Sequence, residues 1–119
     1  MKLAIIGSRS IDEIDLSLHI PCRPSVIISG GAKGVDALAE RYARDHKIAL
    51  RVFLPDYAAF GRYAPLVRNR KIVQESDEIL AVWDGQSRGT KYTIDYARSM
   101  GKTVNVVIVD LPVQMLRPA

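Results

Sequence analysis

The chain has 119 residues, of which 48% are hydrophobic and 25% are charged, as in an ordinary globular domain that buries its own core. Its net charge of +4 favours anionic ligands or nucleic acid, and no apolar run approaches the roughly 20 residues of a membrane-spanning helix. Cys22 is the only cysteine, which excludes an intrachain disulfide. Together with the lack of a signal peptide, this predicts a cytoplasmic protein.

Apolar runs alternate with helical patterns along the chain. The runs predict five strands, at residues 2–6, 25–29, 50–54, 78–83 and 103–109. The segments between them predict four helices: a short one that Ser10 or Asp12 caps and that ends near residue 18, a clear one that begins at residue 35, one over 65–75, and one over 90–100.

This order of elements predicts an α/β fold. Strand and helix alternate throughout, which is typical of a parallel sheet with right-handed crossovers. We therefore expect a Rossmann-like three-layer sandwich, in which a parallel five-stranded sheet of order 3-2-1-4-5 carries helices on both faces. The prediction is a single domain over residues 1–119, with residues 110–119 as an irregular tail.

Three glycine-bearing loops follow the first, second and fourth predicted strands, at residues 7–9, 30–36 and 84–90. The carboxyl ends of parallel strands share one edge of the sheet, where open α/β sheets bind ligands. Glycines let backbone N–H groups approach an anion, and helix N-termini add a positive partial charge. The loops therefore predict a pocket at the carboxyl edge for a ligand that carries phosphate.

The second loop matches neither the Walker A spacing nor G-x-G-x-x-G. Within it, Asp36 either holds the loop by capping or reaches a ribose hydroxyl. In the third loop, Thr90 either caps its helix or binds phosphate through its hydroxyl. Arg68 and Asn69 either belong to a solvated basic turn or face the pocket, where they bind phosphate or a base edge. The predicted ligand-binding residues are Gly7, Ser8, Arg9, Gly30, Gly31, Ala32, Gly34, Asp36, Arg68, Asn69, Gly85, Ser87, Gly89 and Thr90.

The sequence contains no H-E-x-x-H, C-x-x-C or G-x-S-x-G motif, and one histidine near the lone cysteine does not form a zinc site. We therefore predict no metal and no cofactor. Asp84, beside the third glycine loop, is the acidic residue best placed to act as a base, although no partner for it is evident.

At these motifs the chain resembles the SLOG superfamily, and most closely its small stand-alone YspA-like branch. Four segments carry the resemblance: residues 5–9 (Ile-Ile-Gly-Ser-Arg), residues 29–39 around Gly-Gly-Ala-Lys-Gly-Val-Asp, residues 68–71 (Arg-Asn-Arg-Lys), and residues 85–90 with the helix that follows. The resemblance covers about residues 2–109. It implies a Rossmann-like domain that binds a nucleotide or nucleotide derivative at the carboxyl edge, with a ligand sensor as one possible role.

The related LOG-type phosphoribohydrolases imply an alternative, enzymatic function. Their P-G-G-x-G-T-x-x-E segment ends in a catalytic Glu, and here Gly89-Thr90 matches the G-T while Thr93 stands at the Glu position. Arg70-Lys71 resembles the Arg-Lys of their other motif. Cleavage of an N-glycosidic bond usually needs a carboxylate. For a phosphoribohydrolase or a deoxyribosyltransferase-like enzyme, the candidate catalytic residues are Arg70 and Asp84.

The related DNA-processing protein DprA implies a third function, the binding of single-stranded DNA. Aromatic side chains in a basic groove serve such binding, and Tyr57, Phe60 and Tyr63 with Arg62 could supply them. The same residues could equally form a lid over a small ligand. LOG and DprA relatives commonly associate, so the resemblance also implies a homodimer or higher homo-oligomer. The expected partner is a nucleotide-like small molecule, with no membrane.

Overall fold

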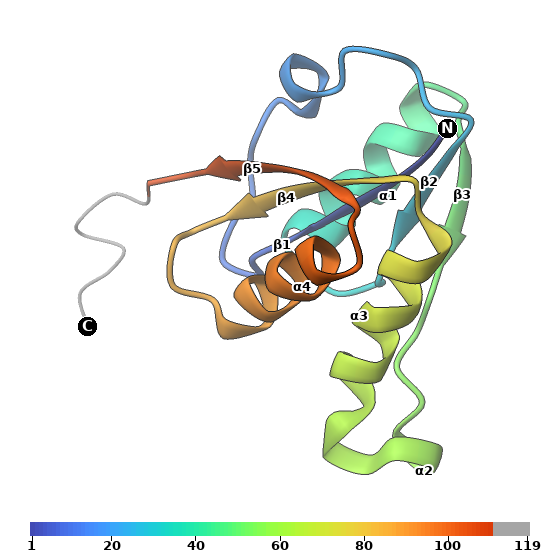
Figure 1. Cartoon of the computed structure of the whole chain (residues 1–119). Helices are drawn as coiled ribbons and strands as arrows, with labels where there is room; N and C mark the ends of the chain where they lie inside the picture. The colour runs from blue at the N-terminus through green and yellow to red at the C-terminus, as the bar shows by residue number, and fades with distance from the viewer. Residues whose placement is uncertain (111–119) are drawn as a thin grey trace.

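The computed structural model describes residues 1–110, and their five strands form one parallel sheet. The strands are β1 (Lys2–Gly7), β2 (Val26–Ser29), β3 (Ala49–Val52), β4 (Glu78–Trp83) and β5 (Thr103–Ile108). Their spatial order is β3-β2-β1-β4-β5, which confirms the predicted topology and fold class (Figure 1). The predicted tail beyond residue 110 lies outside the described residues.

The central strand β1 is buried on both of its faces. Leu3 and Ile5 belong to one hydrophobic core cluster, and Ala4 and Ile6 belong to the other. Strand side chains alternate between the faces of a sheet, so an uninterrupted apolar run identifies a strand that is covered on both sides. Burying one such isoleucine or leucine contributes roughly 1.5–3 kcal/mol.

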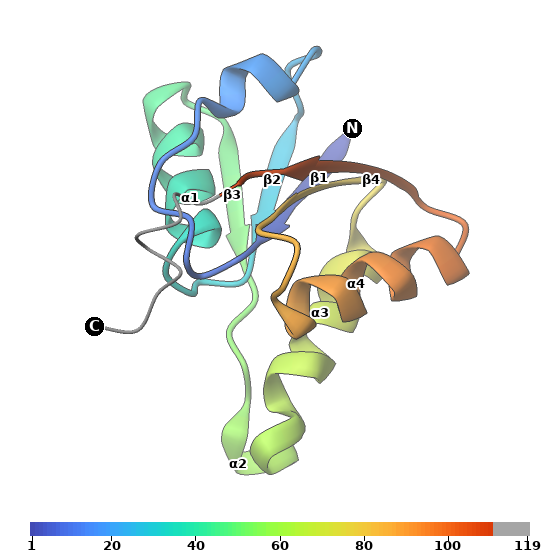
Figure 2. The ribbon, with the colours of Figure 1, turned by 90° about the vertical axis from the view of Figure 1, so that its left-hand side faces the viewer.

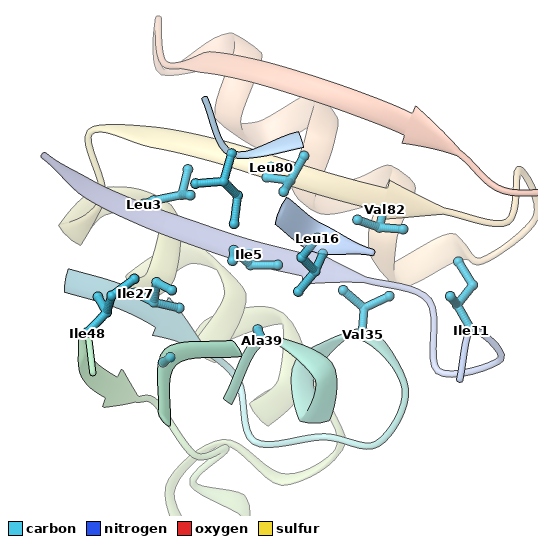
Figure 3. Close-up of a cluster of buried hydrophobic side chains, with 12 residues drawn as sticks. Leu3, Ile5, Ile11, Leu16, Ile27, Val35, Ala39, Ile48, Leu80 and Val82 are labelled. Atoms are coloured by element: carbon cyan, nitrogen blue, oxygen red, sulfur yellow. The ribbon is translucent and has the colours of Figure 1, made fainter. Parts of the chain in front are cut away.

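Helices cover the two faces of the sheet, as Figure 2 shows edge on. On one face lie α1 (Val35–Asp45) and the short 3-10 turn η1 (Leu16–His19), and on the other lie α3 (Ala64–Glu75) and α4 (Arg88–Ser99). Figure 3 shows the first core, where Leu3 and Ile5 of β1 lie on the same side as Val35 and Ala39 of α1. The α/β three-layer arrangement therefore follows from the apolar stripe on each helix.

The segment between β3 and α3 projects from the sheet. It contains α2 (Tyr57–Phe60) and the 3-10 turn η2 (Gly61–Tyr63), which lie beyond the carboxyl ends of β2 and β3 in both views (Figures 1 and 2). Asp56 caps α2, since its side chain accepts a hydrogen bond from the Ala59 N–H at 3.0 Å. Pro55 and Tyr57 of this segment form part of a cavity wall at the carboxyl edge of the sheet.

The first predicted helix is much shorter in the structure, and the second, third and fifth strands are each shorter by one residue. The helix expected from Ser10 or Asp12 is only the four-residue η1, whose N-cap is Asp15. The Asp15 carboxylate accepts hydrogen bonds from both the N–H and the hydroxyl of Ser17, which favours a turn over a long helix. The third strand ends at Val52, before Pro55. Within residues 1–110, no helix is both long enough and apolar enough to cross a lipid bilayer.

Candidate functional site

A cavity of about 360 Å³ lies at the carboxyl edge of the sheet, between the three glycine loops, α3 and the start of the projecting segment. Most of the predicted ligand-binding residues line it: Gly7, Arg9, Gly30, Gly31, Ala32, Asp36, Arg68, Asn69, Ser87, Gly89 and Thr90. The predicted residues that do not line it are Ser8, Gly34 and Gly85. The fold therefore brings together side chains and backbone from loops that are up to about 80 residues apart in the chain.

Ser8 is buried behind the cavity wall and connects the loops through hydrogen bonds. Its N–H donates to the Val82 carbonyl, and its hydroxyl accepts a hydrogen bond from the Asp84 N–H, both at 3.0 Å. Its carbonyl accepts the N–H of Val35 at 3.3 Å. Gly34, with φ +75°, packs directly against the Ser8 carbonyl. Ser8 and Gly34 thus hold the three loops in register.

Asp84 organises the third loop. Its Oδ1 accepts the N–H groups of Gln86 and Ser87, each at 2.8 Å, and its Oδ2 accepts the Ser10 hydroxyl at 2.7 Å. Partial burial acts to raise the pKa of Asp84, but these hydrogen bonds together outweigh it and hold the pKa below its ordinary value. Asp84 is therefore an ionised anchor for the loop, and its side chain does not line the cavity.

Asp36 lies in the first turn of α1 and is only 7% exposed. Its Oδ2 accepts the N–H of Ala32 at 3.1 Å, so the carboxylate holds the second glycine loop against the helix. Burial raises the pKa of Asp36 above its ordinary value, while the hydrogen bond from Ala32 and the charge of Arg68 act in the opposite direction. Of the two predicted roles, the structure shows the loop-holding contact.

Arg68 reaches from α3 to the second glycine loop. Its Nη1 donates to the Gly30 carbonyl, and its Nε donates to the Asn69 side-chain oxygen at 2.7 Å. Burial lowers the pKa of Arg68, and the charge of Asp36 partly compensates. A guanidinium pKa far above neutrality leaves Arg68 charged all the same. Two of the five N–H donors of its guanidinium are therefore committed within the protein.

The N-terminus of α4 forms the opposite wall. Ser87, not Thr90, is the N-cap: the Thr90 N–H donates to the Ser87 hydroxyl at 3.5 Å, and the two hydroxyls lie 3.2 Å apart. No acidic residue stands in the first turn. Thr93, at the position of the LOG-type Glu, lines the cavity and donates its hydroxyl to the Gly89 carbonyl at 2.9 Å.

An apolar part of the cavity wall was missed by sequence reasoning. It consists of Ile6, Pro55, Pro65, Leu66 and Ile72, and Tyr57 lies beside them. The sequence predicts Tyr57 only as part of an aromatic platform for nucleic acid or of a lid over a small ligand. Isoleucine and leucine at strand ends and on helix faces have the same pattern whether they face the core or a cavity, so the sequence carries no signal that separates the two.

The other catalytic candidate, Arg70, lies outside the cavity lining. Its guanidinium carbon sits 5.8 Å from the ring centre of Tyr92 and 5.5 Å from that of Tyr96, and its Nε donates to the Tyr92 hydroxyl at 2.6 Å. It therefore joins α3 to α4. No three His, Cys, Asp or Glu side chains in the described part of the chain are placed to hold a metal ion.

Replacing Asp36 with asparagine is expected to change how stability depends on pH. Because the pKa of Asp36 is raised on folding, the folded state favours the neutral carboxyl more than the unfolded state does. The stability that Asp36 contributes is therefore full below the ordinary carboxyl pKa and is lost as the pH rises through the raised value. The melting temperature of the native chain minus that of Asp36→Asn should fall from about pH 3 to about pH 7.

Asp77→Asn is the matched control, with the opposite sign. A hydrogen bond from the Lys2 N–H at 2.8 Å lowers the pKa of Asp77, so its contribution is present above the ordinary carboxyl pKa and is lost in acid. The same melting-temperature difference should rise with pH for Asp77→Asn. A difference for Asp36→Asn that rises or stays level would contradict the burial argument.

Comparison with known families agrees with this architecture. The family model YAcAr, described as the YspA, cpYpsA-related SLOG family, matches residues 1–60. The matched half of the chain runs from β1 through α2 and contains the first two glycine loops of the cavity. No match was found among curated proteins. The match covers half of the chain, and the chain belongs to the YspA, cpYpsA-related SLOG family.

Proposed function

We propose that the chain binds a nucleotide or nucleotide derivative in the carboxyl-edge cavity, with the phosphate at the N-terminus of α4. The observation that carries the proposal is the makeup of the cavity. One wall is a helix N-terminus with two hydroxyl side chains and the nearby cation Arg9, and another wall is apolar. Membership of a SLOG family supports a nucleotide-related role.

Three helices, α1, α3 and α4, begin at the cavity, and electrostatics favour α4 for the phosphate. The first turn of α3 contains Pro65, which has no N–H group to offer an anion. The first turn of α1 already contains the carboxylate of Asp36, which would repel a phosphate and occupies the Ala32 N–H. The first turn of α4 has no acidic residue. The Asp84 carboxylate accepts the Gln86 and Ser87 N–H groups ahead of that turn and does not line the cavity, so the N–H groups of Arg88 and Gly89 stay beside the Ser87 and Thr90 hydroxyls. Arg9 is exposed and lines the same cavity, so it is available for an anion.

The apolar wall suits the base and sugar of the ligand. Tyr57, Leu66 and Ile72 present aromatic and aliphatic surface at the α3 side of the cavity. Ligand cavities range from about 300 to 1,000 Å³, and 360 Å³ lies near the lower end of that range. A ligand the size of one nucleotide fits this volume better than a dinucleotide or an extended strand.

The test compares nucleoside monophosphates with the matching unphosphorylated nucleosides by isothermal titration calorimetry. Charge-assisted hydrogen bonds contribute about 1.5–3 kcal/mol each, so the monophosphates should bind at least about tenfold more tightly than the nucleosides. Thermal shift offers a second readout, since a ligand at 100 times its dissociation constant adds about 2.7 kcal/mol of stability. Failure of every nucleotide to bind, or equal binding of nucleosides, contradicts the proposal.

A further inference from the structure

Asn69 is a polar group set into the apolar wall of the cavity. It lies on α3 three residues after Leu66 and three before Ile72, and all three residues line the cavity. Residues three apart occupy neighbouring positions on one face of a helix. Any base that packs against this wall therefore comes within reach of the Asn69 amide.

Arg68 determines which atom of the Asn69 amide faces the cavity. The Arg68 Nε donates to the Asn69 Oδ1 at 2.7 Å. A guanidinium has donors and no acceptor, so the amide atom that meets it has to be the oxygen. Arg68 itself is held by its bond to the Gly30 carbonyl, and Asp36 lies close enough to influence its charge. The protein therefore fixes the orientation of the Asn69 amide before any ligand binds.

The amide nitrogen of Asn69 remains free for a ligand. Within residues 1–110, no acceptor engages the Asn69 Nδ2, and no buried side-chain nitrogen or oxygen is left without a partner. The Nδ2 group therefore keeps some contact with the open space that Asn69 lines. An asparagine whose oxygen is turned toward Arg68 presents the two N–H donors of its amide nitrogen to the cavity.

We propose that Asn69 is a specificity residue that selects bases with a carbonyl oxygen at the edge it contacts. The proposal rests on the proposed function. Uracil and hypoxanthine carry such an oxygen where cytosine and adenine carry an amino group, which is a donor. A donor facing a donor leaves both unpaired and costs free energy on desolvation, so the oxo base is favoured. Arg68 acts as the positioning residue for this contact.

The experiment uses two pairs of nucleotides, each pair differing in this group: UMP against CMP, and IMP against AMP. Calorimetry on the native chain should show that UMP binds about tenfold more tightly than CMP, and IMP than AMP, in each pair that binds. A factor of about ten corresponds to about one hydrogen bond. Asn69→Asp replaces the donor with an acceptor of the same shape and should invert the preference. Asn69→Ala should abolish it.

Gln74→Glu is the matched control. Gln74 lies on the same helix, and its amide nitrogen donates to the Tyr96 hydroxyl at 2.9 Å, outside the cavity lining. This variant makes the same change of charge and should keep the native preference. Three outcomes would overturn the inference about Asn69 without touching the proposed function. They are equal binding within each pair, a preference of the native chain for amino bases, and an equal loss of affinity for all four nucleotides in Asn69→Asp. A chain that binds no nucleotide overturns the proposed function and this inference with it.

Discussion

Gly34→Ala should lower the free energy of unfolding by about 3–5 kcal/mol, because it combines backbone strain with a clash. Gly34 has φ +75° and ψ −129°, a conformation that side chains with a Cβ rarely adopt. An added Cβ would lie 2.5 Å from the Ser8 carbonyl oxygen and 2.6 Å from the Arg9 Cα, both backbone atoms. Chemical denaturation should show the loss, and the melting temperature should fall by about 10–20 °C.

Gly61→Ala separates the cost of the backbone conformation from the cost of the clash. Gly61 has nearly the same backbone conformation, with φ +56° and ψ −136°, but an added Cβ would meet no atom within 4 Å. Gly61→Ala should therefore show the cost of the backbone conformation alone, about 1–3 kcal/mol. If the two variants lose equal stability, the first loop is not packed against the start of α1 as the structure describes, and the cavity wall that depends on this packing has to be revised.

The strand order and the convergence of the loops were predictable because they follow from local patterns. Apolar runs that end in glycine identify buried parallel strands, and the topology then places the loops after β1 and β4 side by side. The register confirms this, since Gly7 pairs with Val82 at the ends of the two strands. No knowledge of long-range side-chain contacts was needed for these steps.

The roles of individual side chains were less predictable, because they depend on orientation. Arg68 and Arg70 are two residues apart, which turns them about 200° from each other around α3. Arg68 and Asn69 accordingly face the cavity, while Arg70 packs on the tyrosines of α4. A motif of consecutive basic residues does not say which one faces the ligand. The commitment of Arg68 to Gly30, 38 residues away, is a tertiary contact that no local pattern reports.

Arg9→Ala is expected to weaken the binding of nucleoside monophosphates about 10- to 100-fold, the effect of losing a charge-assisted hydrogen bond. Arg68 is held in place by its bonds to Gly30 and Asn69, and the carboxylate of Asp36 partly offsets its charge, so it is a weaker partner for a phosphate than a cation without these contacts. Arg9 is exposed and is the other cation of the cavity lining, so we expect it to bind the phosphate. Calorimetry with a monophosphate measures the effect, and the melting temperature should stay unchanged because Arg9 is not part of the core.

Two controls show whether Arg9 contacts the phosphate. One is the variant Lys33→Ala, and the other is the binding of the unphosphorylated nucleoside. Lys33 is an exposed cation in the second glycine loop that does not line the cavity, so its removal lowers the net charge equally and should change affinity little. Arg9→Ala should also leave nucleoside binding unchanged, since that ligand carries no anion. Equal losses for the two cation variants would mean that only the overall charge attracts the ligand. An equal loss for nucleoside and nucleotide would place Arg9 against the base or sugar and remove the phosphate from the start of α4.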